Sequence, residues 1–433
     1  MKRNYLYRNW VLILLFFLIV ITYLDRICIS LLGVRIKTEL RLTNEQFGWV
    51  VGAFALAYAI FEIPSGAWGD RIGQRKTLIR IVLWWSFFTA VTGATTGLVS
   101  LIVARFLFGM GEAGAFPNSS AVISRWFPAA ETSRALSSLF IGTNTGAAIA
   151  PLIIVPIAAA FGWRVPFFVI GSLGLVWVLV CFLWFKNEPS EMVKMTSEEK
   201  NFIESRRHYK RQQHRISWKT VLKNRSLRAL VFSYYANQFA FYFFIAWMPI
   251  YLQEARHFFE NEMKIISAII FIFGIIGAFS GGLLSDWLVK RNGVRFARRL
   301  MGGFSMGVSG LAMFTAGSTD DRTLNVVCLI IGYLFLVINI VISFSICLDI
   351  GCDHVGAVAG LMNFSGQIGA FSIAILFGRM VEATHNFNYA FFLISPVLFA
   401  GSLCWLVIDP RKPFMLIGED NRVPETALDK LVV

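Results

Sequence analysis

Two stretches of this sequence, GAWGDRIGQRK at residues 66–76 and GLLSDWLVKRNG at residues 282–293, share one pattern. Each reads Gly-x-x-x-Asp, followed by basic residues and a further glycine. Their aspartates, Asp70 and Asp286, lie 216 residues apart in a chain of 433. A repeat at matched positions of two halves is typical of membrane proteins built from two related bundles. The pattern therefore predicts a duplicated architecture, with Trp287 of the second copy replacing Arg71 of the first.

The composition indicates that lipid is the solvent for much of this chain. Hydrophobic residues make up 56% and charged residues 15%, and the mean hydropathy is +0.63. A soluble domain averages roughly 45–50% apolar and about 25% charged residues. The 41 Phe and 13 Trp exceed what a soluble core can bury. Disordered, collagen-like and disulfide-scaffold classes are excluded, which leaves a membrane protein with many spans.

The apolar runs predict the number of membrane spans, since a spanning helix needs about 20 mainly apolar residues. We expect twelve, near 10–31, 46–67, 77–97, 99–119, 136–159, 164–185, 229–252, 265–286, 299–317, 323–345, 356–380 and 387–408. The longest interruption, 186–228, holds 12 Lys/Arg and five Glu, and it separates six spans from six. The sequence thus predicts an all-α membrane protein: an N-terminal six-helix bundle (1–185), a cytoplasmic linker (186–228), a C-terminal six-helix bundle (229–409) and a cytoplasmic tail (410–433).

The net charge of +14 would suggest nucleic acid binding in a soluble protein. Here the basic residues lie in short loops between apolar runs, as expected for loops on the cytoplasmic side. We therefore expect no nucleic acid partner, both termini in the cytoplasm and a monomer. The short tails favour the inner membrane of a bacterium.

The sequence lacks the motifs of enzymes and metal proteins. The six Cys form no Cys-x-x-Cys pair, and no Cys/His cluster has zinc spacing. Phosphate-binding Gly-x-x-x-x-Gly-Lys-[Ser/Thr] and His-Glu-x-x-His are also missing. We therefore expect no metal, no cofactor and no enzymatic activity.

Four charged residues interrupt the predicted spans, where a charge is expensive and by default functional. Asp25 and Arg26 are neighbours in the first span, so their side chains point about 100° apart and should serve different partners. Arg105 and Glu112 lie seven residues apart in the fourth span. This is close to two helical turns, so one inward face should carry both. For Arg105, a structural tether to a carboxylate is an equal alternative.

Three motifs carry a family resemblance: Tyr23-Leu-Asp25-Arg26, Arg105-x3-Gly109-x2-Glu112-Ala-x2-Phe116-Pro117 and Asn363-Phe364-Ser-Gly366. Together with the repeat, they make the chain resemble the major facilitator superfamily over nearly its whole length. Within that superfamily it resembles the anion:cation symporters, which include bacterial proton symporters for galactonate, glucarate and hexuronate. The resemblance implies proton-coupled uptake of an organic anion, a sugar acid, by alternating access.

The resemblance also implies roles for matching residues. Asp25 and Glu112 would carry the protons, and Arg26 would hold the substrate carboxylate. Arg105 would couple Glu112 to a gate that includes Asp70, Arg71 and Asp286. Chemistry supports the first two roles independently, since Arg offers carboxylates a planar two-nitrogen fork and a buried carboxylate can load and unload a proton.

The remaining pocket residues follow from the resemblance and from the absence of a second fixed cation in two predicted spans. Tyr23, Tyr58 and Asn363 match positions that line the sugar-acid pocket. Spans two and seven carry no second fixed cation, which favours a monocarboxylate with hydroxyls. Asn144 is a further polar candidate, and the residues expected to bind the hydroxyls are Asn237, Gln238, Tyr242, Ser343, Ser345 and Asn363.

Two carboxylates and one alternative function stay open. Glu62 occupies a position where sugar-acid relatives often carry Gln, and it either joins Asp70 or modifies coupling. Asp349 is expected to have a structural role beside basic loops. The alternative function is an anion exchanger or uniporter for a carboxylate, without proton coupling. A sensor is disfavoured by the short tails, and a drug exporter is disfavoured by the buried Arg26.

Overall fold

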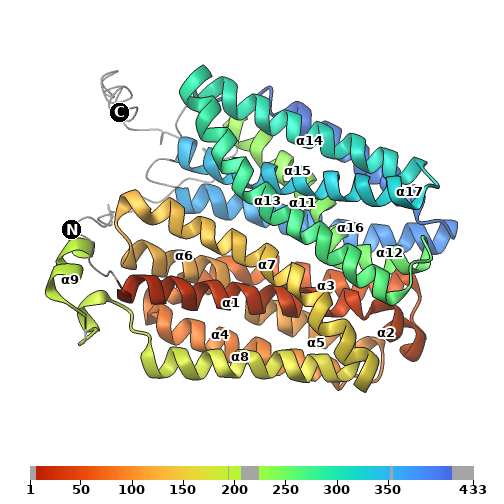
Figure 1. Ribbon diagram of the computed structural model, residues 1–433, viewed down its shortest axis with the longest axis horizontal. Coiled ribbons are helices and arrows are strands. Elements are labelled where there is room, and N and C mark those ends of the chain that lie inside the picture. The colour runs from red at the N-terminus through yellow and green to blue at the C-terminus, as the bar shows by residue number, and fades with distance from the viewer. Residues whose placement is uncertain (1–5, 194, 206–223, 352–354, 412–433) are drawn as a thin grey trace.

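The computed structural model describes residues 6–193, 195–205, 224–351 and 355–411, and these ranges are almost entirely helical and contain no strand (Figure 1). The expected all-α fold is confirmed. The helices are α1 (Leu6–Leu31), α2 (Gly33–Leu40), α3 (Asn44–Ile72), α4 (Gln74–Gly93), α5 (Leu98–Glu112), α6 (Ala115–Trp126), α7 (Ala129–Phe161), α8 (Arg164–Trp184), the 3-10 turn η1 (Pro189–Glu191), α9 (Ser197–Glu204), α11 (Arg225–Ala246), α12 (Met248–Glu254), α13 (Glu260–Asn292), α14 (Val294–Ser318), α15 (Arg322–Gly351), α16 (Val355–Thr384) and α17 (Asn388–Cys404).

Ten segments are long and apolar enough to cross a membrane, with α5 and α6 together forming one of them. The two other expected spans coincide with α4 and α17. Basic residues in its first two turns, Arg75, Lys76 and Arg80, lower the hydropathy of α4, and α17 has only 17 residues. The structure thus supports ten of the twelve predicted spans by length and hydropathy, and the count of twelve stays a prediction.

Several helices differ from the predicted spans. Helices α7 and α13 have 33 residues each, which is about 50 Å and longer than the hydrocarbon layer requires. The span expected at 99–119 is divided into α5 and α6. The span expected at 229–252 is divided into α11 and α12, with Pro249 in the first turn of α12. Proline is tolerated there because the first helical N–H groups have no partner within the helix.

The two copies of the Gly-x-x-x-Asp pattern lie inside helices rather than in loops. Asp70 is in the last turn of α3 and Asp286 is in α13. The turns that follow both helices use a glycine, Gly73 with φ 90° and Gly293 with φ 80°. Residues with a Cβ rarely adopt such angles, which explains why both copies end on glycine.

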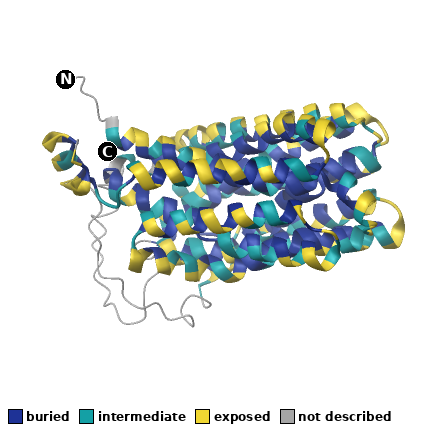
Figure 2. Ribbon diagram, turned by 90° about the horizontal axis from the view of Figure 1, so that it is seen from below, coloured by how far each residue is buried: buried dark blue, intermediate teal, exposed yellow. Residues whose placement is uncertain are grey.

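The helices form two groups that lie against each other, α1–α8 in red to yellow and α11–α17 in green to blue (Figure 1). The groups meet mainly along α3 against α16 and along α7 against α13. The second predicted span of each half therefore contacts the fifth predicted span of the other, as expected for two related bundles. Figure 2 shows buried residues between the helices and exposed residues on the outer surfaces.

The expected linker, 186–228, is partly structured. Helix α9 docks on the start of α1, where the backbone N–H of Arg8 donates to Glu199 at 3.4 Å and the Arg8 guanidinium pairs with Glu131 of α7 at 2.7 Å. Residues 206–223 of this linker and 412–433 of the expected tail lie outside the described residues.

The two ends of the molecule differ in how the halves meet. At the end that carries α2 and α12, called the α2 end, three ion pairs join the halves. They are Arg35–Glu260 at 2.7 Å, Lys37–Glu254 at 2.8 Å and Arg379–Glu45 at 3.6 Å. The α2 end is therefore closed by cross-bundle contacts.

At the opposite end, called the α9 end, the gate residues predicted from the repeat are exposed. Asp70, Arg71 and Asp286 form no ion pair with a described residue. The ion pairs found there stay within one half, as in Arg298–Asp349 at 3.0 Å. Asp349 thus lies beside a basic residue, as expected for a structural role.

Glycines let α3 and α16 approach closely at the α2 end. A Cβ on Gly48 would lie 2.6 Å from the Ala374 carbonyl oxygen, and one on Gly378 would lie 2.4 Å from the Asn44 carbonyl oxygen. Both distances are shorter than atoms tolerate, so these two helices meet backbone to backbone.

Gly378→Ala should lower the melting temperature of the protein in detergent, because the new methyl group would meet a backbone carbonyl. Overpacking of this kind costs about 1–3 kcal/mol. The matched control is Gly360→Ala on the same helix, where a Cβ would meet open space, and where alanine favours the helix by up to about 1 kcal/mol. Equal melting temperatures for the two variants would contradict the close contact.

Arg35→Glu should separate the halves at the α2 end, because it places a carboxylate opposite Glu260. Glu260→Arg should do the same by placing two cations together, whereas the double variant restores the pair. The measurement is the distance between spin labels on Thr38 and Asn261, which lie on different halves. A distance that stays the same in both single variants would argue against a role for this ion pair in closure.

Candidate functional site

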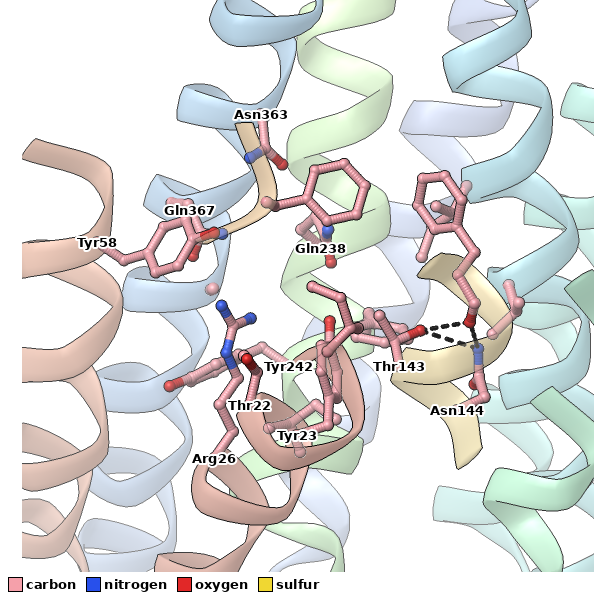
Figure 3. Close-up of a pocket in the computed structure, with 18 of the residues that line it drawn as sticks. Thr22, Tyr23, Arg26, Tyr58, Thr143, Asn144, Gln238, Tyr242, Asn363 and Gln367 are labelled. Atoms are coloured by element: carbon pink, nitrogen blue, oxygen red, sulfur yellow. Dashed lines mark hydrogen bonds between the residues drawn. The ribbon is translucent and has the colours of Figure 1, made fainter. Parts of the chain in front are cut away.

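A cavity of about 100 Å³ lies between the two halves, midway along the helices (Figure 3). Residues from both bundles line it. One of them, Tyr58, lies at the middle of α3, so the cavity is at about half the length of the helices. Seven of the ten predicted substrate-binding residues line it: Tyr23, Arg26, Tyr58, Asn144, Gln238, Tyr242 and Asn363. The fold thus brings to one space residues that are up to 340 positions apart in the chain.

Arg26 is the charged group of this cavity. Its Nε–H donates to Oε1 of Glu112, a fully buried residue of α5. The two terminal nitrogens make no hydrogen bond with a described residue, and in Figure 3 they point into the open centre of the cavity. The guanidinium carbon lies 4.7 to 5.1 Å from the ring centroids of Tyr23, Phe54 and Tyr58. Ring faces attract cations, so the aromatic residues hold this charge in place.

The other charged residues predicted in the spans, Asp25, Arg105 and Glu112, lie behind Arg26 as seen from the cavity. Asp25 is 1% exposed, and neither of its carboxylate oxygens has a hydrogen-bond partner among the described residues. The nearby hydroxyl of Thr89 donates to the Trp85 carbonyl instead, at 3.0 Å. Asp25 and Arg26 thus face different surroundings, as expected for neighbours on a helix.

Arg105 forms no ion pair with a described carboxylate, although a structural tether to a carboxylate was one of its two expected roles. Its guanidinium lies 4.5 Å from the ring centroid of Phe108 and 5.2 Å from that of Phe54. Asp25 and Glu112 are close enough to interact with it electrostatically, but no ion pair joins them to Arg105. Oε1 of Glu112 instead accepts the hydrogen bond from Arg26, and its Oε2 has no hydrogen-bond partner among the described residues.

Two tyrosines join the halves across the cavity. The hydroxyl of Tyr242 on α11 donates to the Val51 carbonyl on α3 at 2.9 Å. The hydroxyl of Tyr333 on α15 donates to Oδ1 of Asn144 on α7 at 3.0 Å. The side-chain oxygen of Asn144 is therefore already hydrogen-bonded within the protein, while Tyr242 presents its ring to the cavity.

Aromatic residues close the cavity toward the α9 end. Phe344 on α15 lies 5.1 Å from Phe140 on α7 and 6.3 Å from Phe116 on α6, measured between ring centroids. Tyr234 packs edge-on against Phe344 at 6.0 Å. Rings from both bundles thus contact one another at this end of the cavity.

Three predicted binding residues, Asn237, Ser343 and Ser345, lie outside the cavity wall. Ser343 is fully buried and donates to Asn339 at 3.3 Å, and Ser345 donates to the Val341 carbonyl at 3.0 Å. Asn237 belongs to the same buried network, with its Nδ2 donating to Asn339 at 3.2 Å. Ser343 and Asn237 thus belong to a buried network of the second bundle, although Oδ1 of Asn237 has no hydrogen-bond partner among the described residues. Ser345 bonds only to its own helix, and none of the three lines the cavity.

Sequence reasoning missed four polar residues of the cavity: Thr22, Thr143, Tyr234 and Gln367. Helical spacing could have found three of them, since Thr22 precedes Arg26 by four residues. Tyr234 precedes Gln238 by four residues and Gln367 follows Asn363 by four, so each pair lies on one helix face. The Nε2 of Gln238 donates to the Tyr234 hydroxyl at 2.9 Å, which joins this pair directly.

No group of three His, Cys, Asp or Glu side chains within the described ranges could hold a metal ion. The polar groups of the cavity are amides, hydroxyls and one guanidinium. Such a set binds an organic anion through hydrogen bonds.

Comparison with known proteins agrees with this geometry. Residues 15–374 match the family model described as Major Facilitator Superfamily. A probable sulfoacetate transporter of Cupriavidus necator is 32% identical over 95% of this chain and 96% of its own length. A hexuronate transporter of Bacillus subtilis is 30% identical over 91% of this chain and 92% of its own.

The fold also resembles a solved structure. A bacterial homologue of the human lysosomal transporter Spinster, in an inward-facing and occupied conformation, superposes with a TM-score of 0.76 at 18% identity, covering 94% of this chain and 97% of that one. The expected family is therefore confirmed: the chain belongs to the Major Facilitator Superfamily and is an integral membrane transporter rather than an enzyme.

Proposed function

We propose that this protein imports an organic anion, a hexonate or hexuronate, together with protons by alternating access. The observation that carries this proposal is that the nitrogens of Arg26 have different surroundings. Its Nε is bound to Glu112, while its two terminal nitrogens face the cavity. A carboxylate or sulfonate presents two oxygens that match such a fork. The named relatives, one for hexuronate and one for sulfoacetate, are both transporters of anions.

The proton part of the proposal rests on the carboxylates around Arg26. A charged group that is buried without hydrogen-bond partners is costly, and both oxygens of Asp25 and one of Glu112 are in this position. Protonation of Glu112 weakens its attraction for Arg26 and frees the guanidinium for a substrate. Loss of the proton restores the ion pair and expels the anion. Asp25 and Glu112 thus serve as the proposed proton carriers.

The transport cycle follows from the two ends of the molecule. We assign the α9 end to the cytoplasm, because the basic loops lie there. The α2 end then faces outward and is closed by its ion pairs in this conformation. Rocking of the halves would break those pairs and bring Asp70, Arg71 and Asp286 together. A monoanion carried with two protons brings one net positive charge inward, which gains about 2.3 kcal/mol per 100 mV.

The setting is part of the same proposal. The protein would act as a monomer in the inner membrane of a bacterium, with both termini in the cytoplasm. An exchanger or uniporter without proton coupling is the alternative, favoured by the ion pair between Arg26 and Glu112 if an incoming anion displaces the carboxylate directly.

The deciding experiment is uptake of radiolabelled galactonate, glucarate, glucuronate and sulfoacetate into proteoliposomes, with and without an inward proton gradient. We expect the wild type to concentrate a sugar acid only with the gradient. Asp25→Asn should keep exchange but lose accumulation, because the residue can no longer carry a proton. The matched control is Asp320→Asn, at an exposed position between α14 and α15.

Three outcomes separate the candidates. Brisk exchange that ignores the gradient would replace the symporter with the exchanger. Uptake of sulfoacetate alone would keep the mechanism and change the substrate. Failure of every anion to move would remove the proposed substrate class.

Arg26→Lys should weaken substrate binding about 10–100-fold, because an ammonium cannot reproduce the two-nitrogen fork and a hydrogen bond to a charged group contributes about 1.5–3 kcal/mol. Binding is measured by titration of the purified protein with the transported anion. Arg228→Lys, at an exposed position of α11, is the matched control and should bind normally. If Arg26→Lys binds as tightly as the control, Arg26 is not the anion site.

A further inference from the structure

Glu62 is a buried carboxylate that the proposed cycle does not use. It lies on α3 one turn after Tyr58 and is 7% exposed. The Nδ2 of Asn363 on α16 donates to its Oε1, so this contact joins the two halves beside the cavity. Glu62 therefore lies with Asn363 and not with Asp70, which answers one of the questions the sequence left open.

The surroundings of Glu62 contain no cation in contact with it among the described residues. Arg26 on α1, Tyr58 on α3 and Tyr234 on α11 face it at longer range. Its one hydrogen bond to a described residue comes from Asn363. The orientation of that amide is thus tied to this carboxylate.

A carboxylate oxygen accepts a hydrogen bond, so it selects the nitrogen side of the amide. The Oδ1 of Asn363 accepts no hydrogen bond from a described residue. Asn363 lines the cavity, and in Figure 3 its oxygen lies on the side of Gln238 while its nitrogen points the other way. The cavity therefore meets an acceptor at this position.

We propose that Glu62 is a positioning residue that presents Oδ1 of Asn363 to the substrate as a hydrogen-bond acceptor. The substrate then carries a hydroxyl group in addition to the anionic group held by Arg26. This inference rests on the proposed function and narrows it, because an anion without a hydroxyl would leave Oδ1 unpaired. Sites that bind a hydroxyl reject analogues that lack it.

The test compares D-galactonate with its single-deoxy analogues as competitors of uptake. We expect the wild type to bind at least one deoxy analogue about tenfold or more weakly. In Glu62→Gln the side-chain amide can donate as well as accept. Asn363 is then free to turn, and this ratio should fall toward one.

A double variant and a control distinguish positioning from tethering. Glu62→Gln with Asn363→Asp puts an acceptor on α16 and a donor on α3 at unchanged total charge, so the preference for the hydroxyl should return. Ser30→Ala removes another cross-bundle hydrogen bond, from the Ser30 hydroxyl to the backbone carbonyl of Ile245 at 2.6 Å, and Ser30 itself does not line the cavity. It should lower the melting temperature and leave the ratio of affinities unchanged.

Each other outcome overturns the inference. A wild type that binds D-galactonate and all its deoxy analogues equally has no such acceptor, whatever the variants do. A ratio that Glu62→Gln leaves unchanged makes Glu62 a tether alone. A wild type that binds no sugar acid removes the proposed function, and the inference falls with it.

Discussion

The ion pair between Arg26 and Glu112 is the interaction on which the rest of this structure depends. A guanidinium in the middle of a bilayer is tolerated only with partners, and Glu112 is fully buried with it. The pair fixes α1 against α5, and the rings of Tyr23, Phe54 and Tyr58 complete the enclosure. Because only one nitrogen of Arg26 is used, the same residue that stabilises the bundle also provides the charge of the cavity.

The packing of the two halves has to enclose the Arg26 charge and still allow the halves to move relative to each other. At the α2 end, Gly48 and Gly378 let α3 and α16 touch through their backbones. Salt bridges such as Arg35–Glu260 add attraction that solvent can replace when the ends separate. Exposed ion pairs contribute little each, typically up to about 1 kcal/mol. A closure built from several of them is therefore easily reversed, as alternating access requires.

The sequence predicted the features that repeat or that cost energy. The matched Gly-x-x-x-Asp patterns, the hydropathy of the spans and the charges at Asp25, Arg26 and Glu112 all carry a signal in the residue type itself. These are the features that lipid makes expensive or that duplication copies. They led to the family and to most of the polar residues that line the cavity.

Details that depend on side-chain direction were less accessible. Ser343 carries the hydroxyl group expected of a pocket residue. That hydroxyl instead donates to Asn339, in a buried network that also contains Asn237. A contact with Asp70 was one of the two roles expected for Glu62, because charged groups often interact at helix ends. A helix turns about 100° per residue, so only the packing of α3 against α16 decides that Glu62 meets Asn363. Partners between the bundles are set by three-dimensional register, which one sequence does not specify.

The charges around the cavity give an independent reason to expect protons. Arg26 and Arg105 supply two fixed cations, while Asp25, Glu112 and Glu62 supply three carboxylates, all of them buried or nearly so. If every carboxylate were ionised, this region would be negative before any anion entered. Each unbalanced buried charge costs several kcal/mol, so an organic anion would be repelled from its own site. Protons on the carboxylates remove that repulsion, and a site of this composition is therefore better suited to bind an anion with protons than to bind it alone.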